Sequence, residues 1–151
     1  MWVRTLNSSE CIGVLAAHRF AHLACAKDNR PYVVPIYYSY SEKALYAFSL
    51  PGKKIDCMRA NPLVSALVDA QRAERGWTSV IADGRYEELP ERLGFKRQWD
   101  HAWSLLSKHA NWWEPGALKT ASVPSADEAK HVFFRIIIEE LSGREAYGDQ
   151  G

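Results

Sequence analysis

The chain has 151 residues, of which 47% are hydrophobic and 25% charged, the size and balance of one globular domain. Lysines and arginines number 19 and aspartates and glutamates 18, so the net charge of +1 gives no bias toward nucleic acid. No apolar run is long enough to span a bilayer, and the first residues lack the layout of a signal peptide. We therefore expect a single cytoplasmic domain over residues 1–151 that binds neither nucleic acid nor membrane.

Short apolar segments separated by turn signals dominate the first half of the chain. Asn7 and Glu10 have the spacing of a capping box at the start of a first helix. Alternating or clustered apolar residues then predict three strands, at residues 20–26, 32–40 and 45–50. Pro35 lacks a backbone donor, so the second of these strands should lie at an edge or a bulge of its sheet.

The second half of the chain continues with strands and one long helix. Strands are expected at residues 63–70, 78–86 and 132–138, with residues 142–147 closing the chain. Apolar residues recur at spacings of three and four between residues 90 and 110, which predicts an amphipathic helix. The irregular stretch at 111–127, with Trp112 and Trp113, is typical of a lid or a dimer contact. Together these elements predict a mainly β (α+β) fold, an antiparallel barrel with flanking helices.

The segment at residues 45–62 has the pattern of a strand, a tight turn and a short helix that stops at Asn61, before a proline. Lys53 and Lys54 then fall in the first turn of this helix, beside free backbone N–H groups. The helix dipole disfavours cations there, but two ammonium groups and the N–H groups together would hold a phosphate. The alternative is that both lysines are solvated surface charges, and their spacing alone favours neither reading.

Other catalytic and metal-binding patterns are weak. His18 and His22 are four residues apart, as on a metal-binding helix, but the strand-like pattern around Phe20 argues against one helix, so no metal site is predicted. His101 and His109 have polar neighbours on the long predicted helix and should be exposed rather than catalytic. The three cysteines contain no Cys-x-x-Cys pair and suit buried apolar positions in a reducing cytoplasm.

Four segments, in order along the chain, resemble those of one family: residues 30–38, 45–62, 76–89 and 135–145. They are similar to the pyridoxamine-phosphate-oxidase-like flavin-binding split barrels. Within that group the chain looks most like the nitroimidazole-resistance-type flavin-nucleotide-binding proteins. Each segment is unspecific by itself, but the ordered set covers most of the chain.

This resemblance implies one antiparallel split β-barrel with flanking helices, which binds FMN at a homodimer interface. Lys53 and Lys54 would hold the phosphate, and Trp77 and Ser79 would reach the cofactor from one subunit or the other. The other implied contacts are Val33, Val34, Pro35 and Ile36 beside the isoalloxazine ring, with Ala47, Phe48 and Ser49 on the next strand.

One departure from the family pattern concerns Phe48, because many relatives carry a histidine at this position. Phenylalanine can pack or stack but cannot transfer a proton, so Phe48 cannot replace the histidine in an activity that needs it. Phe48 either stacks against the cofactor or is ordinary core.

The leading functional hypothesis is an FMN-dependent oxidoreductase that moves a hydride or electrons between a reduced nicotinamide and an unknown small acceptor. No catalytic acid or base is evident in the sequence. One alternative is a non-enzymatic protein that binds or senses flavin or haem, with His18 or His22 as the first candidates for a haem ligand. Another is an empty barrel used only for dimerisation. Oxidation of vitamin B6 itself is not expected.

Overall fold

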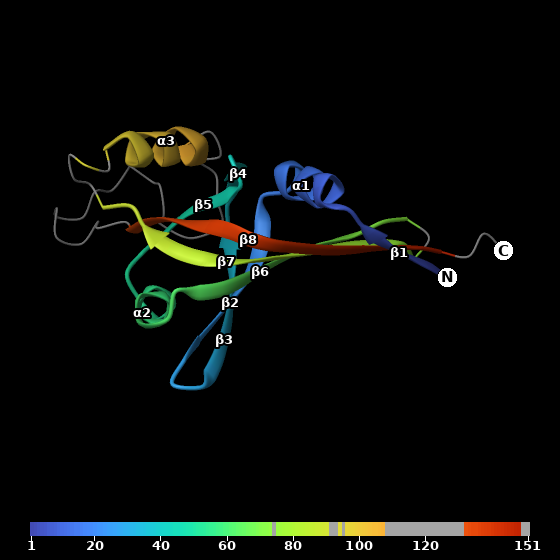
Figure 1. Ribbon diagram of the computed structural model, residues 1–151, viewed down its shortest axis with the longest axis horizontal. Helices are drawn as coiled ribbons and strands as arrows, with labels where there is room; N and C mark the ends of the chain where they lie inside the picture. Colours follow the sequence, from blue (N-terminus) through green and yellow to red (C-terminus); the bar gives the residue numbers. More distant parts are fainter. Residues whose placement is uncertain (74, 91–93, 95, 108–131, 149–151) are drawn as a thin grey trace.

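One antiparallel sheet organises the structure, a computed structural model that describes residues 1–73, 75–90, 94, 96–107 and 132–148 (Figure 1). The strands are β1 (Trp2–Leu6), β2 (Phe20–Lys27), β3 (Arg30–Tyr37), β4 (Ser39–Ser41), β5 (Ala44–Ser49), β6 (Leu63–Gln71), β7 (Trp77–Glu88) and β8 (Val132–Tyr147). The helices are α1 (Ser8–Ala17), α2 (Lys53–Ala60) and α3 (Lys96–Ser107). The mainly β, antiparallel architecture with flanking helices is therefore confirmed.

The sheet curls round on itself because its two ends are joined by one residue. The strand order is β3-β2-β6-β7-β8-β5-β4, with β1 added on β8. Only Tyr38 separates β3 from β4, the strands at the two ends of that order, and β3 also contacts β5. In Figure 1 β2 and β3 cross the long strands β7 and β8 steeply, with α1 and α3 on one side of those strands and α2 on the other. The enclosed core includes Leu23, Leu45, Ile55, Val68, Val80 and Ile136.

Several local predictions are confirmed. Asn7 and Glu10 form the capping box of α1, in which the Glu10 N–H donates to Asn7 Oδ1 and the Asn7 N–H donates to Glu10 Oε1. The short helix α2 ends at Ala60, with Asn61 as its C-cap. Pro35 lies on β3, which pairs only with β2 among the described strands and is thus an edge strand. All three cysteines are free and buried.

The predicted helix at 90–110 is present as α3, while its outer residues 91–93, 95 and 108–110 lie outside the described part of the chain. The stretch at 111–127, with its two tryptophans, and His109 lie outside it as well. The helices that the structure describes are too short or too polar to cross a bilayer.

The single strand predicted at 32–40 is wrong, because the backbone leaves the sheet at Tyr38. The Tyr38 N–H donates to the carbonyl of Arg19 at 2.9 Å instead of to a neighbouring strand. The Tyr38 hydroxyl donates to the carbonyl of Leu15 at 2.8 Å, near the end of α1, where helix carbonyls lack intrahelical partners. Burial raises the pKa of Tyr38, so this hydroxyl keeps its proton. Tyr38 therefore joins the two ends of the sheet to α1.

We expect Tyr38→Phe to lower the free energy of unfolding by about 1–2 kcal/mol, because the buried carbonyl of Leu15 loses its donor. Urea unfolding followed by circular dichroism measures this change. Tyr40→Phe is the matched control, since Tyr40 is half-buried and its hydroxyl accepts only an exposed hydrogen bond, from the Lys43 N–H at 3.3 Å. Equal stabilities of wild type and Tyr38→Phe would show that the hydrogen bond contributes nothing.

The strand predicted at 132–138 is too short, because β8 continues without a break to Tyr147. Gly143, within this longer strand, serves close packing. A Cβ at Gly143 would lie 2.7 Å from the Sγ of Cys11 and 3.1 Å from Leu6. Strand β1, which the sequence analysis missed, pairs with this last part of β8.

An ion-pair network fixes β1 to the sheet. The buried Glu145 carboxylate accepts hydrogen bonds from Arg4 at 2.8 Å and from Arg72 at 2.6 Å, and Arg4 also pairs with Glu10. Burial tends to raise the pKa of Glu145, but hydrogen bonds from Tyr147 and Arg4 and the charge of Arg72 hold it below its ordinary value. Glu145 thus stays ionised in the folded protein.

This depressed pKa predicts a pH dependence of stability. The contribution of Glu145 is complete above the unfolded pKa near 4.3 and is lost as the pH falls through the lower folded pKa. Glu145→Gln should therefore lower stability at pH 7 by about 1–2 kcal/mol, since both arginines are half-exposed. It should also flatten the loss of stability below pH 4.5. Urea unfolding at several pH values tests this, with the exposed Glu140→Gln as control; identical profiles for Glu145→Gln and wild type would contradict it.

Candidate functional site

The predicted phosphate site lies where β5 leads into α2. Three exposed residues follow Ser49, and Gly52 is the N-cap of the helix. Because Gly52 has no side chain, no side-chain cap satisfies the N–H groups of the first turn. Lys53 is exposed and Lys54 half-buried in this turn, where the exposed Asp56 offsets part of their charge. The backbone N–H groups of this turn and the two ammonium groups are of the kind that holds a phosphate.

The β2–β3 hairpin lies beside this helix start. The Nζ of Lys53 lies 4.7 Å from the ring centroid of Tyr32, on β3. Burial and a hydrogen bond with Cys57 raise the pKa of Cys25, on β2, to about 12, and the charge of nearby Lys54 opposes this shift. The two lysines are therefore close to neighbouring strands of one hairpin.

The four residues predicted to run beside the flavin ring alternate between the two faces of β3. Ile36 is 2% exposed and Val34 packs against the core, so both point inward. Val33 is 65% exposed, and Pro35 is exposed too, so both lie on the outer face. They stand opposite residues 24 and 22 of β2. Of these four residues, Val33 and Pro35 are the ones that can offer side chains to a ring on that face.

The three predicted contacts on β5 are all buried. Ala47 points into the main core, whereas Phe48 packs under α3 with its ring 5.8 Å from that of Phe133. The Ser49 hydroxyl donates to the carbonyl of Leu50 at 2.9 Å. Phe48 therefore packs as a core residue, which is the second of the two roles predicted for it. A role of Ala47, Phe48 and Ser49 in cofactor binding stays a prediction.

Trp77 and Ser79 lie far from the helix start within one chain. They begin β7, whose other end, at Glu88, forms an ion pair with Arg59 of α2 at 2.5 Å. A strand of 12 residues is about 36 Å long at roughly 3.3 Å per residue. One chain thus places Lys53 and Lys54 beside the β2–β3 hairpin but leaves Trp77 and Ser79 at the far end of β7, while the predicted residues of β3 and β5 point to different faces.

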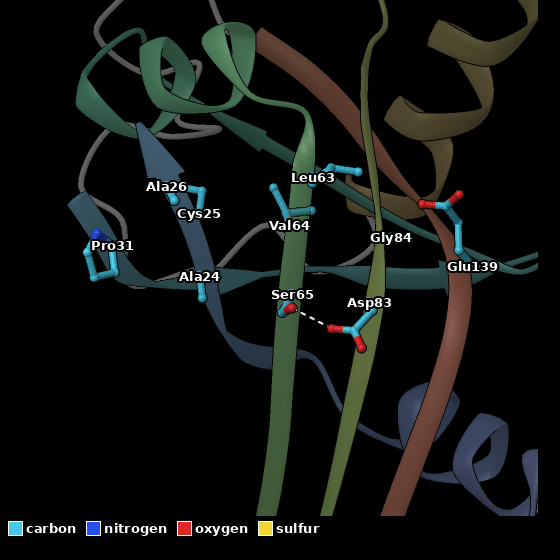
Figure 2. A pocket seen from close by; sticks show the side chains of 10 residues that line it. All are labelled: Ala24, Cys25, Ala26, Pro31, Leu63, Val64, Ser65, Asp83, Gly84 and Glu139. Carbon is cyan, nitrogen blue, oxygen red and sulfur yellow. Dashed lines mark hydrogen bonds between the residues drawn. The ribbon is translucent and has the colours of Figure 1, made fainter. Parts of the chain in front are cut away.

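A second feature, absent from the sequence analysis, is a hollow of about 450 Å³ on the sheet (Figure 2). It opens where β2 and β6 part, because their pairing ends at Ala24 and Ser65. The Ser65 hydroxyl donates to the carboxylate of Asp83, and Glu139 lies beyond Asp83, on β8 (Figure 2). The remaining lining residues are Cys25, Ala26, Pro31, Leu63, Val64 and Gly84. Its carboxylates and its lack of a lysine or arginine make it unsuited to a phosphate, and it contains none of the predicted site residues.

A polar cluster under α3 corrects the prediction for His101, which is half-buried rather than exposed. Its Nε2 lies 3.2 Å from the hydroxyl of Ser41. Its ring forms a T-shaped contact with the Tyr46 ring, with 5.2 Å between the centroids. Arg135, opposite Tyr46 on β8, pairs with Glu87 and donates to the Tyr46 hydroxyl at 3.4 Å. The cluster depends on strand pairing that sequence spacing does not show.

His18 and His22, the candidate metal-binding pair, do not share a helix. His18 follows α1 as its C-cap, and its Nδ1 lies 2.8 Å from the carbonyl of Val14. His22 lies within β2, where its ring packs against Phe20. The four-residue spacing of a helical metal site is therefore not realised here.

Known proteins share this arrangement of strands and helices. A crystal structure described as an FAD-binding protein from Mesorhizobium loti has a TM-score of 0.83 and 62% identity, covering 97% of this chain and 100% of its own. A curated relative from Rhizobium meliloti, described as uncharacterized, is 47% identical over 146 residues, 97% of each chain. A structure from Bacteroides thetaiotaomicron, provisionally described as a 5-nitroimidazole antibiotic resistance protein, has a TM-score of 0.67 at 18% identity, covering 96% of this chain and 89% of its own.

Fold and sequence together define the class, an antiparallel split barrel with flanking helices. The chain belongs to the pyridoxamine 5'-phosphate oxidase family, whose model matches residues 7–145. The family resemblance and the split-barrel fold expected from the sequence are thus confirmed.

Proposed function

We propose that this protein binds a flavin nucleotide, FMN in the first instance, and uses it to transfer electrons or a hydride to a small acceptor. The observation that carries the proposal is the start of α2, where an uncapped first turn carries Lys53 and Lys54. The description of the 62% identical Mesorhizobium loti protein as FAD-binding supports a flavin. The three buried free cysteines are consistent with a cytoplasmic protein.

The chain has residues of the kind that each end of a flavin nucleotide needs. The phosphate end needs backbone N–H groups and cations, which α2 offers. The ring end needs a flat apolar surface, which Val33 and Pro35 offer on the outer face of β3. When bound, the flavin would supply the hydride or electron transfer, while these residues hold its phosphate and orient its ring.

We also propose that the protein acts as a homodimer. Trp77 and Ser79 lie too far from α2 to meet a cofactor held by the same chain, so a second copy would have to bring them there. The outer face of the sheet is apolar enough for such a contact, with exposed Phe20, Val33, Leu63 and Ile81. Light scattering coupled to gel filtration should give the mass of two chains; the mass of one chain would overturn this part of the proposal.

The first experiment is the visible absorption spectrum of the purified protein, with mass spectrometry of what heat releases from it. The two bands of an oxidised flavin with released FMN support the proposal and justify testing reduction by a nicotinamide. Released FAD would support the binding of a flavin and would change the proposed cofactor from FMN to FAD. The same phosphate site serves both, because FMN and FAD share the phosphate next to the ribityl chain. A single intense haem band, or a colourless protein that ignores added FMN and FAD, would overturn the proposal.

A further inference from the structure

The contact between Lys53 and Tyr32 is not among the cofactor contacts that the family resemblance implies. The ammonium of Lys53 lies over the face of the Tyr32 ring, 4.7 Å from its centroid, within the range of a cation–π interaction. We propose that Tyr32 is a positioning residue of the phosphate clamp, which holds the Lys53 side chain where a flavin phosphate binds. This proposal rests on the flavin-binding function proposed above.

The Tyr32 ring is a fixed support. Tyr32 is half-buried and packs against the main core of the barrel. Its backbone lies in β3, directly opposite Cys25 of β2, so strand pairing holds it in place. The ring therefore moves little relative to the sheet. The Lys53 ammonium that lies over it is held at a defined place beside β3.

Lys53 needs such a support more than its neighbour does. It is exposed, and an exposed lysine samples many rotamers that binding must restrict. Contact with the Tyr32 ring restricts them beforehand, so less conformational entropy is lost when a phosphate arrives. Lys54 is half-buried and close to Cys25, so its position is already limited by the body of the protein.

The experiment is a titration of FMN into the flavin-stripped full-length protein, followed by quenching of flavin fluorescence. We expect Tyr32→Leu to weaken FMN binding about two- to fivefold, the size of an exposed cation–π contact. Tyr32→Phe keeps an aromatic face and should bind FMN like wild type. In a Lys53→Ala background, Tyr32→Leu should have no further effect, because the side chain that it positions is gone. Thermal melts of each variant establish that the fold is retained.

Three results would overturn the proposal while leaving flavin binding intact. The first is Tyr32→Leu binding as tightly as wild type while Lys53→Ala binds more weakly. The second is equal weakening by Tyr32→Phe and Tyr32→Leu, which would assign the effect to the hydroxyl. The third is the same weakening by Tyr32→Leu with and without Lys53, which would make Tyr32 only a structural residue. Failure of the proposed function looks different, since FMN then fails to bind wild type.

Discussion

Replacing Lys53 and Lys54 together by alanine should weaken flavin binding by about a hundredfold or more. Each hydrogen bond to a charged group contributes about 1.5–3 kcal/mol, so losing two corresponds to at least that factor. The fold should survive, because Lys53 is exposed and neither side chain belongs to the core. The expected product is a folded protein that purifies with little or no flavin.

The measurement is the ratio of flavin to protein after purification, followed by titration of FMN into the flavin-free protein. Lys27→Ala with Lys96→Ala is the matched control, since it removes the same charge from two other exposed positions. That control should retain its flavin. If the Lys53 and Lys54 variant keeps flavin with wild-type affinity, the phosphate does not bind at the start of α2.

The second large effect is expected from Gly84→Ala, which should destabilise the fold by about 3 kcal/mol. A Cβ at Gly84 would lie 2.3 Å from the carbonyl oxygen of Ile137 and 2.9 Å from Cγ2 of Ile136. The clash is with the backbone of the paired strand β8, at the point where its register with β7 shifts. Backbone cannot move aside as a flexible side chain can, so the barrel must distort.

Urea unfolding of Gly84→Ala beside Gly13→Ala isolates this steric effect. Gly13 lies within α1, and a Cβ there meets nothing within 4 Å. Alanine favours a helix by about 0.8–1 kcal/mol over glycine, so Gly13→Ala should be more stable than wild type. Opposite signs for the two substitutions are the expected result. A Gly84→Ala protein as stable as wild type would show that β7 and β8 have room at this point.

The elements that could be predicted from the sequence are those fixed by neighbouring residues. The capping box of Asn7 and Glu10 and the stop of α2 at Asn61 need no distant contact. The length of β8 could not be predicted in this way, since the role of Gly143 becomes visible only with Cys11 packed against it. The break at Tyr38 likewise depends on α1, which supplies the acceptor for its hydroxyl.

The candidate site likewise contains residues that could be predicted from their neighbours in the sequence and residues that could not. Lys53 and Lys54 follow a turn signal and precede an apolar helical face, so their place in a first turn could be read locally. Tyr32 has no such signal, because only the folding of α2 beside β3 brings its ring under Lys53. The separation of Trp77 from α2 follows from the length and direction of β7, which the segment order of the family resemblance does not reveal.

The position of β8 in the sheet has a consequence for how this protein is made. β8 pairs with β5, β7 and β1, and its contact with β1 links residues 141 positions apart in the sequence. During synthesis β1 and β5 emerge long before the strand that pairs with both, so the barrel cannot close on the ribosome until β8 has left the exit tunnel. Contacts so distant in sequence make folding slow, and they leave strand edges exposed to chaperones or to other nascent chains in the meantime.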